Sequence, residues 1–269
     1  METVNALLRG AFEAFFAVTG DWPQWIGIGI VTLGVMIVAM PIIRWTLVLP
    51  WSDRTKRGLA ASILEMRLYN DRLRTVFRSI FAMLAWAAAY VGVWLLPIAI
   101  TAVILWLPFA HMQSWWGWQG LAAGETTTLR VHVSGEGAGK PTASATAPSG
   151  VTVETPPLWI ASRRELVWRL RADTPGRHEL AVTVDGESHT KELAVADGAA
   201  RRSPVRCSSL AMQLLYPAEP QLPKDGRVSH MTLDYEDAPG FLTPAWTWIL
   251  LLFSFLWYFP LKKPFGVEI

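Results

Sequence analysis

The chain has 269 residues, of which 52% are hydrophobic and 17% are charged, and 15 are tryptophan. Charged residues make up roughly a quarter of ordinary soluble domains, so this composition excludes that class and indicates a membrane protein. The net charge of +2 gives no reason to expect a nucleic-acid partner. The single cysteine, Cys207, excludes an internal disulfide and a cysteine-built zinc site.

Residues 1–20 are predicted to form an amphipathic helix. Apolar residues recur at helical spacing at Val4, Leu7, Leu8, Phe12, Phe15 and Phe16, and the opposite side carries Asn5, Arg9 and Glu13. We expect this helix to lie at a membrane surface. A terminal helix packed on its neighbours would show the same pattern and is the alternative.

Residues 22–50 are predicted to form the first transmembrane helix. The segment 25–49 has one charge, Arg44, and is long enough to cross a hydrocarbon core of about 30 Å. Tryptophans flank the segment, as they do at membrane–water interfaces. Over the whole chain, we expect such interface anchors at Trp22, Trp25, Trp51, Trp115, Trp116, Trp118, Trp246 and Trp248.

Residues 52–94 are predicted to form a cytoplasmic helical hairpin that turns near "YND" (69–71). Residues 52–78 are strongly basic, and basic loops stay on the cytoplasmic side, so the first transmembrane helix has its N-terminal end outside. A heptad seam with one polar member is formed by Leu59, Ile63, Met66, Asn70, Leu73, Phe77 and Ile80. A single amphipathic helix on the lipid headgroups is the alternative.

Residues 79–116 are apolar almost throughout, over about twice the length of one membrane crossing. We place one transmembrane helix at 95–118, with 79–94 half-sunk in the cytoplasmic interface. One crossing leaves Lys262 and Lys263 inside, which agrees with the positive-inside bias. Two crossings would reverse the sides and are the alternative.

Residues 124–197 alternate apolar and polar residues between Gly, Pro, Ser and Asp turns, as in "TTLRVHV" and "ELVWRLRA". They predict a periplasmic β-sandwich, immunoglobulin-like in class, with Trp159 and Trp168 as core aromatics. Residues 199–240 are a proline-rich connector in which "LAMQLLYP" could form a strand. Residues 241–261 are the third transmembrane helix.

The sequence offers little for catalysis. No Ser/His/Asp set is placed to act, and no phosphate-binding glycine loop is present. Metal ligation on a helix needs histidines three or four residues apart, and this spacing is missing among His111, His132, His178, His189 and His230. We therefore expect no enzyme activity, no catalytic residue, no metal site and no cofactor.

Arg44 is the sharpest functional signal because a guanidinium keeps its charge inside a protein. Ionisable residues within transmembrane segments usually face a protein interior or a wet cavity, and they mark function. The alternative is that Arg44 snorkels, since it lies only about five residues from the inner end of the segment.

The layout resembles the three-span core of the YidC/Oxa superfamily of membrane insertases. The resemblance covers residues 22–118 and 241–269, including "LLPIAITAVILWLPFAHMQSWW" and the tail "LKKPFGVEI". Within this superfamily, the layout is most similar to that of the small archaeal members and of the related subunit of the eukaryotic ER membrane complex. The resemblance implies a polar groove that receives a hydrophobic segment, with Arg44 as its basic residue and Thr32, Thr101 and Gln113 as polar neighbours.

Two functions follow as expectations. The first is an insertase-like protein that assists insertion or assembly of apolar membrane segments, with membrane lipid and a client protein as partners. The second is a non-catalytic accessory or anchoring subunit of a larger bacterial membrane complex, with the β-sandwich binding a partner subunit. The inserted sandwich indicates a multi-pass protein of the bacterial inner membrane, with its N-terminus outside and its C-terminus cytoplasmic.

Overall fold

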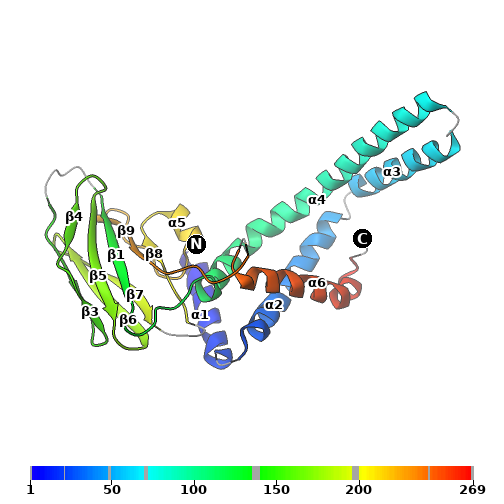
Figure 1. Cartoon of the computed structure of the whole chain (residues 1–269). Coiled ribbons are helices and arrows are strands. Elements are labelled where there is room, and N and C mark those ends of the chain that lie inside the picture. Colours follow the sequence, from blue (N-terminus) through cyan, green and yellow to red (C-terminus); the bar gives the residue numbers. More distant parts are fainter. Residues whose placement is uncertain are drawn as a thin grey trace. The chain divides into compact units, whose positions relative to one another are not determined.

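The computed structural model describes residues 2–20, 22–47, 50–69, 72–134, 140–195, 200–241 and 243–267. The chain divides into two compact units, Met1–Gly29 with Trp106–Leu250, and Ile30–Leu105 with Leu251–Ile269. The helices, labelled in Figure 1, are α1 (Glu2–Thr19), α2 (Gln24–Leu47), α3 (Pro50–Leu68), α4 (Leu73–Trp116), α5 (Leu210–Leu215) and α6 (Ala245–Phe265).

Three helices in the described part of the chain are long and apolar enough to cross a membrane, namely α2 over Gln24–Trp45, α4 and α6. The prediction of three such helices together with a β-sheet region is therefore confirmed. α4 is one helix of 44 residues, about 66 Å long at 1.5 Å per residue. Two crossings would require the chain to reverse within 79–116, and α4 continues through Pro97 and Pro108, so one crossing is favoured.

α3 and the first half of α4 run antiparallel and form a hairpin (Figure 1). Arg78 Nη2 lies 2.6 Å from Glu65 Oε1 near the turn. Further along, Gly58 lies against Trp86, where an added Cβ would come within 2.4 Å of the ring. The two helices thus approach so closely that only glycine fits at position 58.

The predicted seam of this hairpin is wrong in part. Leu73 and Phe77 are 73% and 61% exposed, so they lie outside the contact between the helices. Small polar side chains are buried instead, at Thr55, Ser62 and Ser79. Heptad spacing shows which residues share a face, but it does not show which face meets the other helix. The predicted polar member, Asn70, lies outside the described residues.

The β region consists of two antiparallel sheets. The larger has the order β3-β5-β1-β9-β8, with β4 paired to β5, and the smaller has the order β2-β6-β7. The strands are β1 (Thr126–Val133), β2 (Ala143–Thr146), β3 (Val151–Val153), β4 (Leu158–Ile160), β5 (Glu165–Ala172), β6 (Gly176–Val184), β7 (Glu187–Val195), β8 (Val205–Cys207) and β9 (Val228–Leu233).

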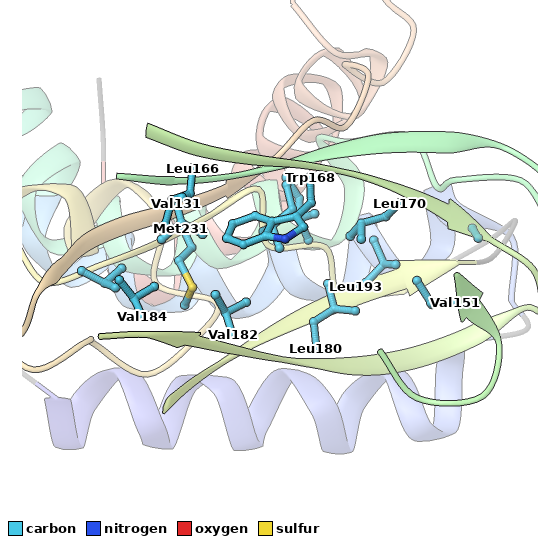
Figure 2. Close-up of a cluster of buried hydrophobic side chains, with 14 of the residues drawn as sticks. Val131, Val151, Leu166, Trp168, Leu170, Leu180, Val182, Val184, Leu193 and Met231 are labelled. Carbon is cyan, nitrogen blue, oxygen red and sulfur yellow. The ribbon is translucent and has the colours of Figure 1, made fainter. Parts of the chain in front are cut away.

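One apolar core lies between the two sheets (Figure 2). Trp168 of β5 is 1% exposed and lies between Leu166 on its own strand and Leu193 of the smaller sheet, as Figure 2 shows. The prediction of Trp168 as a core aromatic is confirmed, whereas Trp159 is only partly buried at the margin of the core. Alternation along β1 and β5 buries every second side chain, because successive side chains point to opposite faces.

The region predicted as a connector contributes to the β region. Its strands β8 and β9 complete the larger sheet, with β9 paired to β1. The possible strand in "LAMQLLYP" is wrong, since this segment forms the helix α5. Leucine, alanine, methionine and glutamine are all good helix formers, which explains the difference.

Candidate functional site

Arg44 lies in the last turn of α2, and its guanidinium meets the end of α6. Its Nη1 donates a hydrogen bond of 2.9 Å to the backbone oxygen of Phe265. Gly266 follows with φ of +61°, and the amides of Gly266 and Val267 bond back to the carbonyls of Lys263 and Lys262. This is a glycine-based helix C-terminus, where the partial negative charge of the last carbonyls attracts a cation. Arg44 therefore caps α6.

The other predicted groove residues lie on α2 and α4. Thr32 is fully buried on α2, and Thr101 on α4 is half-buried with an enclosed hydroxyl. Gln113 belongs to the other compact unit, where it lines a small cavity beside Ser114. The polar groove therefore stays a prediction.

We expect Arg44→Leu to lower the free energy of unfolding of the purified protein by about 0.5–1.5 kcal/mol, because it removes an exposed hydrogen bond from a charged donor to the Phe265 carbonyl. Arg44→Lys keeps a cation at the helix end and is expected to retain most of that stability. Lys262→Ala, which removes a cation from the same helix end without touching this bond, is the control. Thermal unfolding of the three variants in detergent measures the effect, and equal stability of Arg44→Leu and the parent protein would contradict the capping role.

The predicted interface tryptophans fall into two groups. Trp22, Trp25, Trp51 and Trp248 are exposed, as interfacial anchors must be. Trp115, Trp116 and Trp246 are buried instead, and Trp118 is half-buried. The Trp115 ring stacks on Phe16 with centroids 3.8 Å apart, and the centroids of Trp116 and Trp246 are 6.4 Å apart. These rings therefore tie α1 and the start of α6 to the end of α4.

The polar side of α1 faces protein. Asn5 is buried, and Glu13 Oε1 lies 2.6 Å from Arg201 Nη1 beyond β7. Apolar Leu7 and Val18 point outward and are 70% and 72% exposed. These contacts fit a helix packed on its neighbours, which is one of the two predicted placements.

A second group of charges lies inside the β region, and the sequence analysis missed it. Lys191 on β7 is fully buried, and its Nζ bonds Glu219 Oε1 and, at 2.5 Å, the Ser203 carbonyl. Burial lowers the pKa of Lys191, and Glu219 acts in the opposite direction. The signal in the sequence was a lysine at an inward position of β7, opposite Leu180.

The exposed surface of the hairpin is the strongest candidate for a functional contact. We define the hairpin apolar face as the exposed residues Leu64, Leu68, Leu73, Phe77, Phe81 and Leu84. Small residues thus lie inside the hairpin and large apolar residues lie on its outer surface, where they are available for an apolar contact. Exposed basic residues lie on the same two helices and just before α4, at Arg54, Lys56, Arg57, Arg67, Arg72, Arg74 and Arg78. The hairpin thus combines an apolar contact surface with a strong positive charge.

Within the described residues, no cluster of three or more His, Cys, Asp or Glu side chains is arranged to hold a metal ion. Comparison of the chain with protein-family models, curated proteins and solved structures finds no match, so the candidate function rests on the residues and the geometry described above.

Proposed function

We propose that this protein is an insertase-like membrane protein that binds apolar segments of other membrane proteins and assists their insertion. The observation that carries the proposal is the hairpin apolar face, where Phe77 and Phe81 are 61% and 69% exposed. Large exposed apolar patches mark sites for protein or membrane contact. The basic bias of the hairpin supports its cytoplasmic location, which is where a newly made segment arrives.

The mechanism is physical. A client segment leaves water by covering the hairpin apolar face, which stabilises the complex by about 25 cal/mol per Å² of apolar area removed from water. α4 then offers a continuous path, since the same helix that carries Phe77 and Phe81 runs on as a candidate membrane span. The exposed arginines and lysines attract acidic residues that flank the client segment.

Several finer assignments belong to this proposal. They are membership of the YidC/Oxa superfamily, location in the bacterial inner membrane with the N-terminus outside, and an immunoglobulin-like class for the two-sheet region. Three candidate spans, a basic hairpin between the first two, and a β region between the second and third support them. Arg44 acts in this scheme through its cap on α6, which holds the end of the third span next to the first.

Site-specific photocrosslinking tests the proposed function. A photoreactive residue placed at Phe81 is expected to crosslink to a ribosome-bound nascent chain carrying a 20-residue leucine–alanine segment. The same residue at Ala89, which is exposed on α4 and lies about 80° or more around that helix from Phe77, Phe81 and Leu84, is the control and is expected to give much weaker crosslinks. Equal crosslinking from both positions would contradict the proposal. Crosslinks from Phe81 to one resident membrane protein, and none to nascent chains, would favour the accessory-subunit function instead.

A further inference from the structure

A groove opens where α4 ends and α2 begins, entirely within one compact unit. Its volume is ≈ 410 Å³, and its walls include Trp22, Trp115, Trp116 and Trp118. The aromatic contacts described above hold Trp115 and Trp116 in place. Gln24, the first residue of α2, and Gln119 add amide groups to the lining.

Arg202 is the one charged side chain among the described residues that line this groove. It is 4% exposed, its Nη1 donates to the Trp118 carbonyl at 3.2 Å, and its backbone amide donates to the Ser114 carbonyl at 2.7 Å. The guanidinium is therefore held at the groove by the end of α4. A fixed arginine beside indole rings is complementary to an anionic group attached to an apolar body.

We propose that this groove binds the phosphate headgroup of a membrane phospholipid. The inference rests on the proposal that α2 and α4 span a membrane, but it is independent of client binding at the hairpin. The ends of both helices meet at the groove, and tryptophan rings prefer the headgroup level of a bilayer. An anionic phosphate bound there meets Arg202, while the glycerol and upper acyl carbons meet the tryptophans.

The test uses a charge pair at one exposed position. Gln24→Glu places a negative charge in the groove and suits the first turn of a helix, so it leaves α2 intact. Gln24→Lys places the opposite charge at the same position. Ser188→Glu on the exposed side of β7 changes the net charge equally, away from the groove, and is the control. Binding of short-chain phosphatidylglycerol to the full-length protein is measured by titration in detergent, with inorganic phosphate in a parallel arm.

We expect Gln24→Glu to weaken phospholipid binding about tenfold or more, Gln24→Lys to tighten it, and Ser188→Glu to leave it unchanged. Arg202→Gln is expected to abolish it. Inorganic phosphate is expected to bind at least tenfold more weakly than the phospholipid because it lacks the part that meets the tryptophans. Equal affinity of the two Gln24 variants, or equal binding of inorganic phosphate and phospholipid, would overturn the proposal. The outcome of the phospholipid titrations does not affect crosslinking at the hairpin. The proposal of phospholipid binding and the proposal of client binding can therefore fail separately.

Discussion

Glu219→Ala is expected to destabilise the β region by about 3–5 kcal/mol, because it leaves the fully buried ammonium of Lys191 without its counter-charge. Cys207 offers a direct readout. It is the only cysteine in the chain and is buried, so its thiol reacts with a maleimide only when β8 opens. A change of about 1.4 kcal/mol corresponds to a tenfold change in an equilibrium constant. Labelling of Cys207 under native conditions is therefore expected to be on the order of 100-fold or more faster in Glu219→Ala than in the parent protein.

Two further variants isolate the charge effect. Glu187→Ala removes an exposed carboxylate from the same strand as Lys191 and is expected to change stability by less than about 1 kcal/mol. The double variant Lys191→Met with Glu219→Leu replaces the ion pair by apolar side chains of similar size. It is expected to recover most of the lost stability, since buried ion pairs rarely outweigh an apolar replacement. Labelling of the double variant as fast as that of Glu219→Ala would refute the assignment.

Phe77→Asp combined with Phe81→Asp is expected to abolish binding of a fluorescent leucine–alanine peptide to the purified protein. Each aspartate puts a charge into the apolar contact, which costs about 2.5–3.5 kcal/mol where the surroundings are lipid-like. Both positions are exposed and lie away from Gly58 and Trp86, so the hairpin itself is expected to stay folded. Fluorescence anisotropy measures the peptide affinity.

The matched control carries two aspartates on the same hairpin outside the apolar face, at Tyr69 and Ala89, which are exposed and lie about 80° or more around their helices from the residues of that face. It is expected to bind the peptide within about threefold of the parent protein, because neither position contributes to the hairpin apolar face. Loss of binding in this control as well would show that negative charge anywhere on the hairpin is sufficient, which contradicts an apolar contact.

The sequence was informative where one periodicity dominates. Hydropathy located the three long apolar helices, and alternation located β1 and β5 because each buries every second residue. Short strands such as β4 and β8, of three residues each, are too brief to show a period. They form because longer neighbours offer unpaired backbone groups, and that information is not local.

The contacts of Arg44 were also hard to predict because they depend on residues far away in the sequence. The partner of Arg44 lies 221 residues away, at a helix end that no spacing rule connects to α2. The prediction of the hairpin seam failed for a different reason. It assigned large apolar residues at heptad spacing to the interior of the hairpin, and two of them, Leu73 and Phe77, are exposed. The face that packs between the two helices is instead formed by small residues, among them Thr55, Gly58 and Ser62.

Reconstituted insertion tests the central claim, that the hairpin apolar face helps apolar segments to enter a bilayer. Purified protein in liposomes is presented with a released leucine–alanine segment joined to a protease-sensitive tag. The fraction of tag protected from added protease measures insertion. We predict that the parent protein raises this fraction severalfold over empty liposomes, and that Phe77→Asp with Phe81→Asp returns it to the empty-liposome level. Insertion by this variant at the parent level, with both proteins present in equal amounts, would contradict the account.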